Sequence, residues 1–102
     1  MKKYVLFVGL NDKDTKVQEI PVLSAYKMAM NVINSHCDGG TISEAQGFYK
    51  HDDGTIVIEN SLRVELLFVE RATVLAIVND LKMILNQESI IMQSEEIQSE
   101  MI

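Results

Sequence analysis

The stretch TISEAQGFYKHDDGTIVIENSLRVELLFV, residues 41–69, decides the fold of this chain. It holds the strongest turn signal in the sequence, HDDG at 51–54, between two extended segments. An Asp-Gly step in that setting usually forms a hairpin. After the turn, residues 55–69 alternate in polarity, which predicts a long strand with one side toward a core. We expect a β-bulge at Asn60-Ser61, where the alternation breaks.

Each side of this hairpin carries one helix and one further strand. Residues 21–35 and 71–86 place apolar side chains at helical spacing, which predicts two amphipathic helices. Pro21 lies at the expected first position of the earlier helix, where proline is favoured. The outer segments, KYVLFVGL at 3–10 and SIIMQ at 89–93, are short and apolar and predict strands.

The resulting order is β-α-β-β-α-β, which is typical of the ferredoxin-like fold. This fold class is α+β: a two-layer sandwich of a four-stranded antiparallel sheet with two helices on one face. Its first and third strands are central, and these are the strands that are apolar on both sides, at least in part. We expect residues 1–102 to form a single domain of this type, with 94–102 as an extra edge strand or a frayed tail.

Two helices cover only one face of such a sheet. A monomer seldom leaves a large apolar patch in water, so we expect a homo-oligomer, most simply a two-fold dimer, joined through the open sheet face. The alternative is that charged residues of the third strand make this face acceptable to water. The apolar residues predicted for this oligomer face are Val5, Phe7, Leu67 and Val69.

Composition limits the classes of function. The chain has one cysteine, Cys37, and a formal net charge of −6. A lone cysteine forms no intrachain disulfide, which fits a reducing compartment, and the apolar start reads as a strand rather than a signal peptide. We therefore expect a cytoplasmic protein. No apolar run approaches the roughly 20 residues of a membrane helix.

The excess of acidic residues limits the classes of binding partner. Every charged residue after Lys82 is acidic. Binding to nucleic acid usually needs a basic surface, so nucleic acid is disfavoured as a partner. A basic protein partner remains open, and so does the commoner alternative that the acids only keep a small domain soluble.

The sequence predicts no catalytic residue, metal site or cofactor. His51 beside Asp52 and Asp53 has the right groups for a base or a metal ligand, but neighbouring residues in a turn point in different directions. As residues that contact a small-molecule ligand we select Tyr26, Tyr49 and His51.

Four short motifs resemble a family of small bacterial proteins known only as a domain of unknown function. They are VLFVGL at 5–10, the strand that runs from Gly40-Thr41 to Gly47-Phe48-Tyr49, DGTIVIENS at 53–61 and NQESI at 86–90. The resemblance covers most of the chain and implies the same fold, but the family has no known activity to transfer. The element order also resembles, more loosely, PII-like regulators and dimeric α+β barrel enzymes. PII-like proteins carry a long loop between the second and third strands, and the short turn here disfavours nucleotide sensing of that kind.

Three functions fit these observations. The first is a non-enzymatic binding or regulatory module, a homo-oligomer whose ligand lies between the sheet and loop 11–20 or at the hairpin tip. The second is a small enzyme of the dimeric α+β barrel type, with the selected aromatic residues near an internal pocket. The third is an acidic protein–protein inhibitor of phage or plasmid origin, which needs the acids of residues 88–100 on one face. Convergent polar groups in a pocket would favour the enzyme.

Overall fold

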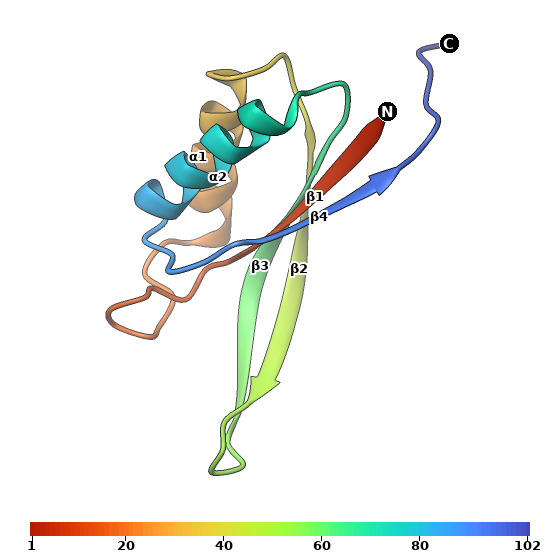
Figure 1. The fold of residues 1–102 in the computed structure, drawn as a ribbon. Helices are drawn as coiled ribbons and strands as arrows, with labels where there is room; N and C mark the ends of the chain where they lie inside the picture. Colours follow the sequence, from red (N-terminus) through yellow and green to blue (C-terminus); the bar gives the residue numbers. More distant parts are fainter.

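The computed structural model describes all of residues 1–102. Its elements are β1 (Lys2–Gly9), α1 (Val22–Asn34), β2 (Thr41–Lys50), β3 (Ile56–Leu66), α2 (Arg71–Ile84) and β4 (Ile91–Glu96). The strands form one antiparallel sheet in the order β2-β3-β1-β4, and both helices lie on one side of it (Figure 1). The predicted ferredoxin-like order is confirmed, as are the central places of the first and third strands.

The core lies between the helices and the side of the sheet that faces them. Side chains of a strand alternate between the two faces, and the helix-facing residues Leu6, Leu62 and Val64 are fully buried. Each helix turns one apolar stripe toward these strands. The buried stripe residues are Ala25, Ala29 and Ile33 of α1 and Val74, Ile77 and Leu81 of α2.

The end of α2 prepares the site described below. Asn86 adopts a left-handed backbone with φ 49°, a conformation that asparagine tolerates better than most residues. The Gln87 backbone N–H then donates to the Lys82 carbonyl at 2.9 Å. At the other helix, Pro21 precedes the first helical residue by one position, so the predicted start was one residue early.

The predicted β-bulge at Asn60-Ser61 is wrong. Pairing between β2 and β3 runs unbroken through this point, with Gln46 opposite Asn60 and Ala45 opposite Ser61. Polarity breaks there because Asn60 faces a loop instead of the apolar core. Its side-chain amide donates to the Gln18 side chain at 2.9 Å.

The predicted oligomer face needs a correction as well. β3 ends at Leu66, and Phe68 takes a left-handed φ of 59° that turns the chain out of the sheet. Leu67 therefore follows the strand, and Val69 packs against the core on the helix side. Of the four predicted residues, only Val5 and Phe7 belong to the open face of the sheet.

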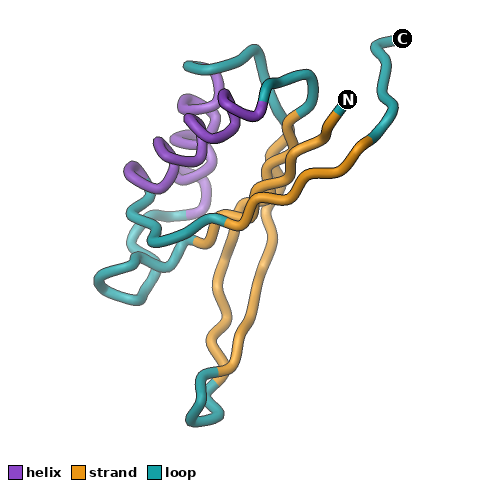
Figure 2. The backbone as a smooth tube through the Cα atoms, in the orientation of Figure 1, coloured by secondary structure: helices purple, strands orange, loops and turns teal.

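The hairpin of β2 and β3 extends past both helices as an arm, residues 46–58 (Figures 1 and 2). The molecule measures 48 Å along its longest axis, against 24 and 23 Å across. On the arm no helix covers the helix-side face of the sheet. Phe48, Ile56 and Ile58 are consequently 79%, 62% and 63% exposed there.

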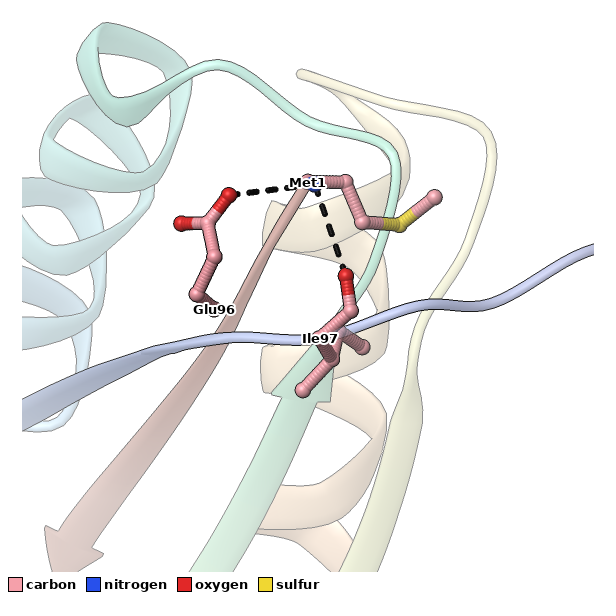
Figure 3. Close-up of polar contacts among 3 residues, drawn as sticks. All are labelled: Met1, Glu96 and Ile97. Carbon is pink, nitrogen blue, oxygen red and sulfur yellow. Dashed lines mark hydrogen bonds and ion pairs between the residues drawn. The ribbon is translucent and has the colours of Figure 1, made fainter.

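The chain end leaves the sheet at the opposite pole from the arm (Figure 2). Residues 94–96 belong to β4, and the tail, residues 97–102, has no regular structure. The tail starts from a fixed point: the Met1 ammonium group contacts the Glu96 carboxylate at 3.2 Å and the Ile97 carbonyl at 3.4 Å (Figure 3). The Ile97 backbone N–H donates to the Met1 carbonyl at 2.9 Å. Neither helix is long and apolar enough to cross a membrane.

Candidate functional site

The open face divides into two unlike halves. Near the start of β1 it carries a charge network, in which Lys3 contacts Glu95 at 2.9 Å and Glu65 at 3.5 Å, and Arg63 contacts Glu65 at 2.9 Å. The hydrogen bond that Lys3 donates to Glu95 raises the pKa of Lys3, and the hydrogen bond that Arg63 donates to Glu65 lowers the pKa of Glu65. Long charged side chains cover apolar neighbours with their stems. Val5 lies among them and is only 5% exposed, so this half offers no apolar patch.

The other half of the open face holds a cleft of about 630 Å³. Its floor is formed by Phe7 and Gly9 of β1 and by Glu59 and Ser61 of β3. Loop 11–16 and residues 87–89 form the walls, and the outer part of β2 closes the arm side. A volume of this size is typical of sites for small organic ligands.

Glu59 is the best-placed functional group in the cleft. One oxygen of its half-buried carboxylate accepts a hydrogen bond from the Asn11 backbone N–H at 2.9 Å. A Cβ atom at position 9 would lie 2.6 Å from this carboxylate, so the carboxylate occupies space that only a glycine leaves free. No ion pair neutralises Glu59. It therefore offers a fixed, uncompensated negative charge to a ligand.

The walls of the cleft are tied together by buried amide groups. The nearly buried Gln87 donates from its side-chain nitrogen to the carbonyls of Asn11, at 2.9 Å, and Leu85, at 3.2 Å. A buried amide with satisfied hydrogen bonds holds its neighbours in one geometry. Loop 11–20 is thus joined to the end of α2, and the backbone N–H that orients Glu59 belongs to this anchored loop.

A second tie lies at the outer rim. The Asn86 side chain donates to Asp12 and to Asp14, both at 2.9 Å. Asp12 also accepts hydrogen bonds from the backbone of Asp14 and Thr15. The hydrogen bond from Asn86, and then those from the backbone, lower the pKa of Asp12 because they stabilise its charged form.

The lining combines aromatic rings with charges of both signs. Phe7 and Tyr49 line the cleft, while Lys13 and Lys16 stand on the loop wall. Aromatic faces and a carboxylate attract organic cations, and lysines attract carboxylate or phosphate groups. The cleft therefore suits a ligand that has a flat ring system and carries both a positive and a negative group.

The structure places the three predicted ligand residues differently. Tyr49 lines the cleft, and its ring makes an edge contact with His51, with centroids 5.3 Å apart. His51 lies at the arm tip, outside the cleft lining, and Tyr26 lies on α1, on the helix side of the sheet. Sequence reasoning missed Glu59 and Gln87. The only signal in the sequence was a glycine ending an apolar strand and a glutamate on the polar parity of β3.

Comparison with known proteins places the fold. No protein-family model and no curated protein matches the chain. Among solved structures it is similar to a phage SAM lyase in complex with S-methyl-5'-thioadenosine, with a TM-score of 0.69 and 22% identity over 93% of this chain and 80% of that one. The apo form of a phage SAM lyase gives a TM-score of 0.67 at 18% identity, covering 92% of this chain and 78% of the other.

Two further likenesses cover nearly the whole chain. A DUF3240 family protein from Shewanella baltica OS155 has a TM-score of 0.57 and 9% identity, over 99% of this chain and 96% of the other. The periplasmic divalent cation tolerance protein CutA from Archaeoglobus fulgidus has a TM-score of 0.54 and 10% identity, over 99% of this chain and 88% of the other. These likenesses confirm the ferredoxin-like fold and the resemblance to small unknown-function and PII-like proteins.

Proposed function

We propose that this chain is a homo-oligomeric domain that binds a small cationic ligand in the open-face cleft, over Glu59. The observation that supports it most is the Glu59 carboxylate itself, held by the Asn11 N–H at 2.9 Å and left without a cationic partner. A half-buried charge with no partner costs stability, and a binding site is the usual reason to keep one.

S-adenosylmethionine is the ligand that we propose. It has a flat adenine ring, a sulfonium and an ammonium group, and a carboxylate, which match the aromatic residues, Glu59 and the wall lysines of the cleft. Independent support comes from the likeness to a phage SAM lyase that was solved with S-methyl-5'-thioadenosine. The carboxylate of Glu59 would hold the cationic centre or the ribose hydroxyls of the ligand.

The same likeness favours a second candidate, a small enzyme. Breaking the bond between the sulfonium and the amino-acid chain of S-adenosylmethionine leaves the electron pair on sulfur and releases the neutral S-methyl-5'-thioadenosine. A lyase does this without water, so the amino-acid fragment closes on itself or loses a proton. Glu59 touches the cleft floor and is the candidate group to accept that proton or to orient the chain.

One experiment separates these candidates. Binding of S-adenosylmethionine is measured by calorimetry for the full chain, for Glu59→Gln and for Glu44→Gln, an exposed control on β2 outside the cleft. We expect the loss of the carboxylate to weaken binding at least tenfold and the control to bind normally. Chromatography of the same mixtures for S-methyl-5'-thioadenosine then tells binding alone from cleavage. A full chain that binds no S-adenosylmethionine would refute the ligand assignment.

The remaining predictions have less support. Glu88 lines the cleft, Glu95 pairs with Lys3 on the open face, and Glu96 contacts the chain start. Adjacent strand residues point to opposite faces, so Glu95 and Glu96 do not share the single acidic face that an inhibitor of a basic partner needs. A cytoplasmic location remains our expectation, supported by the lone Cys37.

The homo-oligomer that we propose uses the open face around the cleft. Phe7 is half-buried there, and Ile91, its neighbour on β4, is 62% exposed. A second copy laid over these residues would cover the cleft and exclude water from it. The mass of the protein in solution, measured by light scattering, tests this arrangement directly.

A further inference from the structure

Gln87, at 8% exposed, is the one amide or charged side chain that the fold buries. Its side-chain nitrogen donates to the Asn11 carbonyl at 2.9 Å and to the Leu85 carbonyl at 3.2 Å. An amide nitrogen carries two hydrogens, so both donors are used on backbone carbonyls of two separate segments. Burying an amide costs free energy unless its hydrogen bonds are made. The orientation of this side chain is therefore fixed.

Asn11 connects the Gln87 amide to the Glu59 carboxylate. The Asn11 carbonyl accepts from Gln87, and the Asn11 backbone N–H donates to Glu59 at 2.9 Å. This carbonyl and this N–H belong to the two rigid peptide planes on either side of the Asn11 Cα. The two hydrogen bonds together set the backbone angles of Asn11, so a change at its carbonyl also moves the N–H that holds Glu59.

Glu59 has no other support of this kind. The Asn11 N–H is the only group of the chain that donates to its carboxylate, and no cation pairs with it. Gly9 leaves the space that the carboxylate fills but contributes no hydrogen bond to it. A functional side chain keeps one geometry only when the groups that hold it are themselves held. The orientation of Glu59 thus depends on how firmly Asn11 is fixed.

We propose that Gln87 is a positioning residue of the cleft, which acts through Asn11 to hold the Glu59 carboxylate in the orientation that receives the cationic group of the ligand. Leu85, its other acceptor, is buried at the end of α2, beside loop 11–20 (Figure 1). The end of the helix is the fixed point from which the carboxylate is placed. This inference rests on the proposed function, but the orientation of Glu59 can be measured without any ligand.

Gln18 provides a matched control for Gln87. It anchors the same loop from the sheet side, donating to the Ile20 carbonyl and accepting from the Asn60 side chain, both at 2.9 Å. Neither of these hydrogen bonds involves the Asn11 carbonyl. Methionine is a flexible, unbranched side chain that lacks an amide. Gln87→Met and Gln18→Met therefore each remove two hydrogen bonds from the loop and leave a side chain of similar length.

The first measurement follows the amide proton of Asn11 by NMR between neutral and acid pH. When the Glu59 carboxylate takes up a proton, it becomes a weaker acceptor, and the chemical shift of the Asn11 amide proton changes. The same titration of Glu59→Gln gives the part of the change that comes from other carboxylates, such as Asp12. We expect the part that depends on Glu59 to be lost in Gln87→Met and kept in Gln18→Met.

Binding of S-adenosylmethionine, measured by calorimetry, gives a second result. We expect Gln87→Met to weaken binding about tenfold, and to have no further effect in a chain that already carries Glu59→Gln, because the group that it positions is then gone. Gln18→Met should bind as the unmodified chain does. A merely structural role of Gln87 would weaken binding by the same factor with and without the Glu59 carboxylate.

The Asn11 titration decides the outcome. The proposal is overturned if folded Gln87→Met keeps the Glu59-dependent shift of Asn11, or if Gln18→Met loses this shift as well. If Gln87→Met does not fold, the same titration is made on Gln87→Asn, which keeps an amide but is one methylene too short to reach both carbonyls, and the same two results decide. Absence of S-adenosylmethionine binding by the unmodified chain would refute the proposed ligand, and it would not alter the titration.

Discussion

The two halves of β3 have nearly the same alternation of apolar side chains but differ in how far these side chains are buried. In the body, Leu62, Val64 and Leu66 are fully buried, whereas on the arm Ile56 and Ile58 of the same strand and the same face stay mostly exposed. The only difference is the helix layer, which covers the body half and ends before the arm (Figure 1). An alternating pattern therefore specifies a face of the sheet, and the opposite layer specifies whether that face becomes a core or stays exposed.

The largest effect should be on the free energy of unfolding, when one apolar side chain in each half of β3 is truncated to alanine. Leu62→Ala should lower the free energy of unfolding by about 3 kcal/mol, because it leaves a cavity in a close-packed core. Ile58→Ala should change it by less than about 0.5 kcal/mol, because the side chain is already exposed to solvent in a single chain. Urea unfolding of the two variants at low protein concentration measures both values. Equal losses would mean that Ile58 is packed within the chain.

A smaller effect should distinguish a substitution inside the cleft from one outside it. Gly9→Ala places a Cβ at 2.6 Å from the Glu59 carboxylate and must displace it, while the control Gly39→Ala lies outside the cleft and meets no atom within 4 Å. A flexible side-chain end moves at little cost, so stability should hardly change in either variant. Ligand binding should weaken about tenfold in Gly9→Ala alone, which corresponds to about 1.4 kcal/mol. Calorimetry with S-adenosylmethionine checks this, and equal binding by both variants would contradict the role of Glu59.

The smallest effect should be on the pH dependence of stability, which should differ between Asp12 at the rim of the cleft and Asp53 in the hairpin turn. Hydrogen bonds lower the pKa of Asp12, chiefly from Asn86, and that of Asp53, chiefly from the Thr55 backbone. A lowered folded-state pKa contributes stability that is present above the ordinary value of 3.8 and is lost as the pH falls through the folded value.

Asp12 joins a loop to the end of α2, whereas Asp53 acts only within the hairpin turn. Unfolding curves at several pH values between about 2 and 6 should therefore show a shallower acid loss of stability in Asp12→Asn than in the unmodified chain. Asp53→Asn should also lose less stability in acid than the unmodified chain. This change should be confined to the arm, and amide hydrogen exchange of residues 49–57 would reveal it. If Asp12→Asn loses stability in acid as steeply as the unmodified chain, the hydrogen bond between Asn86 and Asp12 does not persist in solution.

Much of the fold was predictable from local pattern. The HDDG turn, the two amphipathic helices and the strand apolar on both sides specify element order and the central strands, since each depends on residues close together in the sequence. The errors arose where a distant segment decides the outcome. Asn60 resembled a bulge because the sequence does not reveal that Gln18 receives its side chain. Val69 resembled a strand residue because the left-handed turn at Phe68 is not encoded by a glycine.

The candidate site was much less predictable than the fold. Tyr49 was selected from the sequence and lines the candidate cleft, but Glu59 was counted only as a charge on the open face. Its position depends on the space left by Gly9 of β1 and on the N–H of Asn11 beyond that strand, which are 48 or more residues away in the chain. Contacts between such distant residues exist only after the sheet has formed.

The sequence alone determined the β-α-β-β-α-β order, the antiparallel hairpin and the sides of each strand, because turn chemistry and the periodicity of apolar side chains act locally. The tertiary structure alone decided which apolar side chains become core and which remain on the arm, because that depends on where the helix layer ends. It also decided that the open face, predicted as an apolar surface, consists of a charge network beside a polar cleft. Val5 is covered by the stems of charged neighbours, and Leu67 and Val69 leave the sheet altogether.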